Sequence, residues 1–190
     1  MIGAFEYVTV LISIVLGLGI TQILTGLAAL FQKIEKIKTY WPHLLWVLFV
    51  LILQIQEWWV TYELRYHEHW RLPTFLFIML YPVNLFVIAK MLFPKNIKGK
   101  TFDFRKFYLN NYRKIFLLFI LSALLSIVYN LSILNLNFES QILQTFLIII
   151  FSIVTFKQFN QQWIHKTLAV LVITILAISI VIEWNVWLIN

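Results

Sequence analysis

Six long apolar stretches, separated by short polar segments, dominate the pattern along the chain. A helix rises 1.5 Å per residue, so about 20 residues cross the ~30 Å hydrocarbon core of a bilayer. Backbone polar groups in lipid must pair within their own segment, which makes these stretches helices. The pattern predicts an all-α polytopic membrane protein, a single domain over residues 1–190 with a bundle of six transmembrane helices. The predicted spans are 7–31, 41–60, 72–93, 115–134, 141–156 and 167–189.

Composition supports this class of protein. Of the 190 residues, 62% are hydrophobic and 12% are charged, whereas a soluble domain is about half apolar and about a quarter charged. The apolar run behind the N-terminus is longer than the core of a signal peptide, so we expect a retained first span. The chain has no cysteine, which excludes disulfides, thiol catalysis and thiolate metal sites.

Basic residues lie almost entirely on one side of the predicted spans. That side holds 13 of the 15 lysines and arginines, and only Arg65 and Arg71 fall on the other. Short loops rich in lysine and arginine face the cytoplasm. We therefore expect the N-terminus and the C-terminus on the non-cytoplasmic side.

The segment 95–114 is the longest polar stretch between spans. Phe104, Tyr108 and Tyr112 recur at helical spacing, and Thr101 is the expected N-cap. This pattern predicts an amphipathic helix at the cytoplasmic interface, where each cation attracts anionic lipid by ~1 kcal/mol. A protein or RNA partner is the alternative, because basic and aromatic side chains also form RNA-binding surfaces. The basic face comprises Lys95, Lys98, Lys100, Arg105, Lys106, Arg113 and Lys114.

The stretch "GLGITQILTG" (17–26) places small residues along the first span. Small side chains let helix backbones approach closely in a membrane. The spacing predicts that this helix packs centrally and that Gln22 hydrogen-bonds across an interface. The partner helix belongs either to this chain or to a second copy, so a homo-oligomer stays open. The packing residues are Ser13, Gly17, Gly19, Thr21 and Gly26.

Polar residues also gather near the outer ends of the predicted spans. Glu57 lies ~24 Å along the second span if that span begins at residue 41, which places it near the outer edge of the hydrocarbon. One interpretation is ordinary contact with headgroups and water. The other is an outward-facing vestibule that binds a cation or proton. The vestibule residues would be Gln54, Glu57, Asn130, Gln144 and Glu183, with Gln22 and Asn84 deeper along the path.

Catalytic patterns are not evident in the sequence. We find no Ser/His/Asp arrangement, no nucleotide-binding loop, no histidine-rich metal motif and no sizeable soluble domain. We therefore expect no enzyme, no cofactor and no bound metal.

The first third of the chain carries a resemblance. The stretch "FEYVTVLISIVLGLGITQILTGLAALFQ", followed by "YWPHLLWVLFVLILQIQEWW", resembles an uncharacterised group of small bacterial multi-pass inner-membrane proteins. The resemblance implies the bacterial inner membrane and brings no activity with it. In size and kind the chain also resembles accessory membrane proteins of phage-defence loci, including certain RNA-targeting CRISPR systems. The expected function is a non-enzymatic accessory or interaction protein, in a defence or stress system. The alternative is a small ion or proton channel or transporter.

Overall fold

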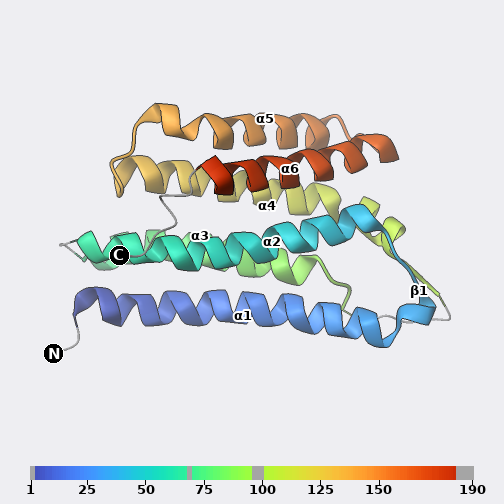
Figure 1. Cartoon of the computed structure of the whole chain (residues 1–190), viewed down its shortest axis with the longest axis horizontal. Helices are drawn as coiled ribbons and strands as arrows, with labels where there is room; N and C mark the ends of the chain where they lie inside the picture. The colour runs from blue at the N-terminus through green and yellow to red at the C-terminus, as the bar shows by residue number, and fades with distance from the viewer. Residues whose placement is uncertain (1–2, 68–69, 96–100, 183–190) are drawn as a thin grey trace.

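Six helices run along the long axis of the molecule (Figure 1). The computed structural model describes residues 3–67, 70–95 and 101–182. All six helical segments are long and apolar enough to cross a membrane, so the prediction of an all-α chain with six spans is confirmed. The helices are α1 (Ala4–Gln32), α2 (Trp41–Val60), α3 (Leu72–Met91), α4 (Phe104–Ser132), α5 (Ile142–Phe156) and α6 (Gln162–Ile182). Three short 3₁₀ turns are η1 (Ile34–Lys36), η2 (Thr61–Tyr66) and η3 (Phe138–Gln141).

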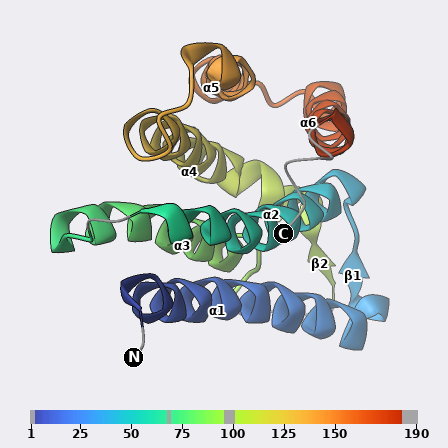
Figure 2. The ribbon, with the colours of Figure 1, turned by 60° about the vertical axis from the view of Figure 1, so that its left-hand side comes forward.

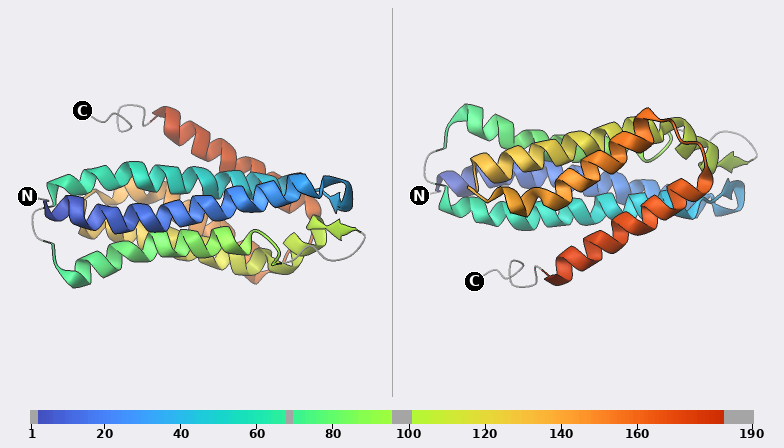
Figure 3. Two further views of the ribbon diagram at one scale, coloured as in Figure 1. Left: turned by 90° about the horizontal axis from the view of Figure 1, so that it is seen from below. Right: turned by 90° about the horizontal axis from the view of Figure 1, so that it is seen from above.

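The helix α2 lies at the centre of the arrangement. It packs against α1, α3, α4 and α6, while α1 also packs on α3, α3 on α4, and α4 on α5. Figure 2 shows α5 and α6 on the far side of the molecule from α1. The helix α6 diverges from the bundle toward its C-terminal end (Figure 3). The sixth helix therefore depends mainly on α2 for its packing.

The connections fall at two opposite ends of the bundle. One end, called the basic end because it carries most of the lysines and arginines, holds the α1–α2, α3–α4 and α5–α6 connections. The opposite end, called the N-terminal end because α1 begins there, holds the α2–α3 and α4–α5 connections. Helix α1 begins and helix α6 finishes at this N-terminal end of the bundle (Figure 3). At the basic end, strand β1 (Ile37–Lys38) pairs in parallel with β2 (Phe102–Asp103), and this joins two of the three loops.

The segment that was predicted as a separate interfacial helix is instead the first part of α4. The helix runs without a break from Phe104 to Ser132. Its N-cap is Asp103, not Thr101 as expected, because the Asp103 carboxylate accepts hydrogen bonds from the backbone amides of Arg105 and Lys106. The aromatic residues of this segment bury against the rest of the bundle, so its apolar face covers protein and not lipid.

The glycines of α1 differ in their surroundings. A Cβ added at Gly19 would lie 2.6 Å from Nε2 of Gln54, and one added at Gly26 would lie 2.5 Å from ring carbons of Phe93. A Cβ at Gly17 would meet no atom within 4 Å. Gly19 and Gly26 therefore lie where α1 approaches other parts of this chain closely, and Gly17 does not. The expectation that this helix packs centrally is wrong, because α1 packs mainly against α2 and α3, at one side of the bundle (Figure 2). Thr21 is exposed, and its hydroxyl donates to the Gly17 carbonyl of its own helix at 2.8 Å.

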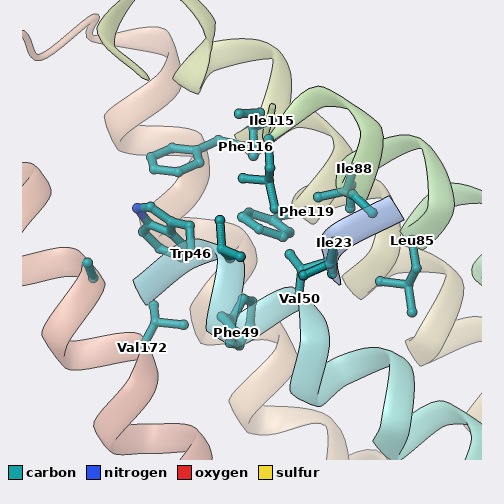
Figure 4. Close-up of a cluster of buried hydrophobic side chains, with 14 of the residues drawn as sticks. Ile23, Trp46, Phe49, Val50, Leu85, Ile88, Ile115, Phe116, Phe119 and Val172 are labelled. Carbon is teal, nitrogen blue, oxygen red and sulfur yellow. The ribbon is translucent and has the colours of Figure 1, made fainter. Parts of the chain in front are cut away.

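Aromatic side chains fill the middle of the bundle. The Trp46 ring lies 5.2 Å from Phe116 and 5.5 Å from Phe119, centroid to centroid. Phe151 of α5 lies 5.0 Å from Phe116 and stacks on Phe119 at 5.4 Å. With Phe49, these five residues form the aromatic cluster; Figure 4 shows Trp46, Phe49, Phe116 and Phe119 beside aliphatic core residues. Pairs at these distances add to the stabilisation from burial, and the cluster closes the space between α2, α4 and α5.

Candidate functional site

A cavity of about 610 Å³ lies between α2, α3, α4, α5 and α6, in the half of the bundle toward the N-terminal end. Its lining is divided by chemistry. Near the N-terminal end it is polar, with residues of η2, η3 and the adjoining helix ends. Toward the middle of the bundle it is lined by aromatic and aliphatic side chains. The volume is in the range of pockets that hold small molecules, about 300–1,000 Å³.

Glu57 is the central polar residue of this cavity. It is half-buried on the last turns of α2, and the phenol-bearing residues Tyr81 of α3 and Tyr129 of α4 line the same cavity. Within the described ranges, its carboxylate makes no hydrogen bond or ion pair. Helix α2 therefore presents an acidic group, without a protein partner, to an enclosed space.

Two other predicted vestibule residues also line the cavity, Asn130 and Gln144. The Nδ2 of Asn130 donates to Oε1 of Gln141 at 2.9 Å. Gln141 is buried and in turn donates to Ser140 Oγ at 2.6 Å. This chain of side chains joins α4 to η3 and fixes the wall where the fifth helix begins. Sequence reasoning missed Gln141, although its place just before an apolar run was a usable signal.

The aromatic cluster forms the closed end of the cavity. Phe49, Phe119 and Phe151 line it directly, and Trp46 and Phe116 lie behind them with almost no exposed surface. Eight residues separate Phe49 from Glu57, which is ~12 Å along a helix. The cavity therefore opens toward the N-terminal end and ends against packed rings before it reaches the basic end.

Two predicted vestibule residues lie elsewhere in the bundle. Gln54 is fully buried between α1 and α3, over the backbone of Gly19, and its Nε2 is 3.4 Å from the Leu85 carbonyl. Asn84 donates to the Leu118 carbonyl at 2.9 Å and to Ser122 Oγ at 2.7 Å. Both side chains therefore hold helices together.

The remaining two predicted vestibule residues are Gln22 and Glu183. Gln22 lies on α1, which does not contribute to the lining, and the described residues give its side chain no hydrogen-bond partner. Glu183 falls outside the described residues.

A buried hydrogen-bond chain lies on the basic side of the aromatic cluster, and the sequence did not predict it. His165 Nε2 is 2.8 Å from the Phe159 carbonyl, so this nitrogen carries the proton and Nδ1 is an acceptor. The Tyr108 hydroxyl, 2.9 Å away, donates to Nδ1 and accepts from Trp46 Nε1 at 3.2 Å. Each group has its partner, and the chain joins α2, α4 and α6 at the end where α6 packs most closely.

The predicted basic face is partly described. Its members on α4 project from the exposed side of the helix, at the end that also carries the β1–β2 pair. Beneath them, burial raises the pKa of the Tyr40 phenol, and the Arg105 guanidinium partly offsets this, so the phenol is neutral at physiological pH. Lys98 and Lys100 lie outside the described residues. The exposed members are Lys95, Arg105, Lys106, Arg113 and Lys114.

Among the described residues, no group of three or more His, Cys, Asp or Glu side chains is placed to hold a metal ion. No protein-family model matches the chain, and neither the curated proteins nor the solved structures gave a significant match. The function must therefore be inferred from the features of this chain itself. These are six membrane-spanning helices, a cavity in one half of the bundle and a basic end.

Proposed function

We propose that the chain is a non-enzymatic accessory protein of the bacterial inner membrane, which acts by binding at its basic end. The observation that carries the proposal is that basic residues gather on one end of a well-packed bundle. By the distribution of lysine and arginine, this end faces the cytoplasm and both termini face away from it. A role in a defence or stress system is the setting favoured by the likeness of the chain, in size and kind, to accessory membrane proteins of phage-defence loci.

The construction of the basic end supports this role. The side chains of Arg105, Lys106 and Arg113 project from the first turns of α4, whose other face is buried in the bundle. The cap at Asp103 and the pairing of β1 with β2 hold this segment in place. A fixed cluster of cations attracts anionic lipid at ~1 kcal/mol per cation near the surface.

The binding test compares lipids around the reconstituted protein. Spin-labelled phosphatidylglycerol and spin-labelled phosphatidylcholine report, by electron spin resonance, how much of each lipid is immobilised. Wild type should prefer the anionic lipid, and the triple variant Arg105→Gln, Lys106→Gln, Arg113→Gln should lower that preference several-fold. High salt should have the same effect, because it screens exposed charges. The control, Arg71→Gln at the other end, should leave the preference unchanged.

An unchanged lipid preference in the triple variant would refute lipid binding by this face. If such a variant nevertheless lost its cellular phenotype, the face would serve a protein or RNA partner. Orientation can be tested directly because the natural chain has no cysteine. We expect a membrane-impermeant maleimide added outside cells to label Asn137→Cys and to leave Asn110→Cys unlabelled, and the reverse pattern would invert the topology.

A small channel or transporter is the second candidate, and the cavity around Glu57 favours it. A conducting path would have to pass the aromatic cluster, which closes the cavity toward the basic end. The assay is flux of protons and alkali cations into liposomes under an imposed potential and pH gradient. Flux that falls in Glu57→Gln, but not in the exposed control Glu139→Gln, would support transport. Flux no higher than that of empty liposomes would refute it.

A further inference from the structure

The wall of the cavity is rich in hydrogen-bond acceptors and lacks cations. Glu57 and Glu63 line it, whereas none of the described lining residues is a lysine, arginine or histidine. The amide oxygens of Gln56 and Gln144, also in the lining, are buried without a donor partner among the described residues. Buried acceptors without donors are costly. The polar half of the cavity is therefore complementary to a positively charged group that carries N–H donors.

Aromatic faces surround the same space. Tyr81 and Tyr129 contribute phenol rings, and Trp59 contributes an indole. The Tyr62 ring also lines the cavity, but the Arg65 guanidinium already lies over it, 3.8 Å from the ring centroid. Aromatic rings attract ammonium groups by cation–π interaction, and more strongly where water is excluded. A carboxylate together with several aromatic rings is a combination that recognises an ammonium group. It disfavours a phosphate, because a phosphate would meet two carboxylates, and the described lining residues include no lysine, arginine or histidine.

The inner half of the cavity has a different chemistry. Phe49, Phe119 and Phe151 close it, and Leu147, Val172 and Leu176 line its sides. The distance along α2 from Glu57 to Phe49 is ~12 Å. A ligand that fills both halves therefore has a charged head and an apolar body of about this length.

The cavity is also bounded by two helices that scarcely touch. Helix α5 packs on α4 and α6 packs on α2, and within the described ranges α5 and α6 share almost no close backbone contact. Residues of both helices nevertheless line the cavity, among them Leu147 and Leu176. Figures 2 and 3 show α6 diverging from its neighbours over this part of its length. The outer faces of α5 and α6 are apolar, so this side of the cavity faces the bilayer.

We propose that the cavity is a binding site for an amphiphilic amine, which enters from the bilayer between α5 and α6. The ammonium head lies against Glu57 and the neighbouring phenol rings, and the apolar body lies on the aromatic cluster. The site is independent of the basic end, and it requires binding only, without passage across the membrane.

The test is equilibrium dialysis of the full chain in phosphatidylcholine nanodiscs, with radiolabelled octylammonium as the probe. Empty nanodiscs give the partition into lipid, which is subtracted. Octyl phosphate, which has the same alkyl chain and the opposite charge, is the matched control ligand. We expect saturable binding of octylammonium and none of octyl phosphate. Glu57→Gln should weaken binding about 10- to 100-fold, the range expected for a lost charge-assisted hydrogen bond, and Glu139→Gln, outside the cavity, should not.

A second variant tests the cavity without changing its charge. Leu147→Trp places a larger side chain in the space between α5 and α6, where it should abolish octylammonium binding. A near-native circular dichroism spectrum and a retained monodisperse elution profile would show that the variants are folded. The proposal is overturned if octyl phosphate binds as well as octylammonium. It is also overturned if a folded Glu57→Gln protein binds octylammonium as wild type does, or if folded Leu147→Trp retains binding.

Discussion

Substitution of Gly26 by alanine tests how closely α1 packs on the rest of the bundle. The added Cβ would lie 2.5 Å from three ring carbons of Phe93, which is closer than non-bonded carbons approach. Phe93 is itself buried, and the contact falls on the ring near its attachment, so a small rotation cannot relieve it. Inserting a methyl group into a packed core costs about 1–3 kcal/mol.

The matched control is Gly17→Ala on the same helix. An added Cβ at Gly17 meets nothing within 4 Å, and replacing glycine by alanine within a helix in water gains about 0.8–1.0 kcal/mol. We therefore expect Gly17→Ala to be neutral or slightly stabilising. Gly26→Ala should have a free energy of unfolding about 1–3 kcal/mol lower than Gly17→Ala.

The assay is reversible unfolding in mixed micelles, followed by tryptophan fluorescence as sodium dodecyl sulfate is added. A double-mutant cycle makes the test specific. In a Phe93→Leu background the ring is absent, so Gly26→Ala should lose most of its penalty, which identifies the contact by its coupling energy. Equal stability of the Gly26→Ala and Gly17→Ala proteins would refute the close approach of α1 to the end of α3. An unchanged penalty in the Phe93→Leu background would refute Phe93 as the cause.

Two further substitutions test buried polar contacts. Tyr108→Phe leaves Trp46 Nε1 without an acceptor and His165 Nδ1 without a donor, so we expect a loss of about 1–3 kcal/mol in the same unfolding assay. Tyr112→Phe is its control, because the buried Tyr112 hydroxyl has no hydrogen-bond partner among the described residues. This control should be neutral or stabilising, and a larger loss than in Tyr108→Phe would contradict the assigned hydrogen bonds. Asn84→Ala removes both hydrogen bonds from α3 to α4, and interhelical hydrogen bonds in membranes contribute about 0.6 kcal/mol on average and up to about 1.7. A change outside that range in thermal unfolding would contradict a purely structural role.

The lengths of the apolar stretches predicted the spans well, because insertion of a helix into a membrane depends on the hydrophobicity summed over its whole length. The start of α4 was misjudged for a physical reason. The pattern of Phe104, Tyr108 and Tyr112 is amphipathic whether its apolar face meets lipid or protein, and only the tertiary structure distinguishes the two. The N-cap was misplaced at Thr101 because two capping residues occur close together, and the chain uses the second, Asp103.

The cavity was only partly predictable, for a related reason. Depth in the membrane follows from counting residues along a helix, and that count predicted Glu57, Asn130 and Gln144 in one layer; all three line the cavity. The direction in which a side chain points depends on the rotation of its helix. Gln54 is one turn from Glu57, yet it faces Gly19 of α1 while Glu57 faces the cavity. The aromatic cluster joins α2, α4 and α5, and no single stretch of sequence contains it.

The packing of α6 on α2 has a consequence for biogenesis. Helices leave the ribosome in order, so α1, α2 and α3 can assemble as soon as the third has been inserted. The partner of α6 is a helix made four helices earlier. Until synthesis is nearly complete, one flank of α2 lacks its final neighbour, and the acceptor nitrogen that completes the Tyr108 hydrogen bond has not been supplied. A chain that stops short of α6 would retain five inserted helices and an unfinished surface, and cells triage incompletely folded proteins with chaperones and proteases.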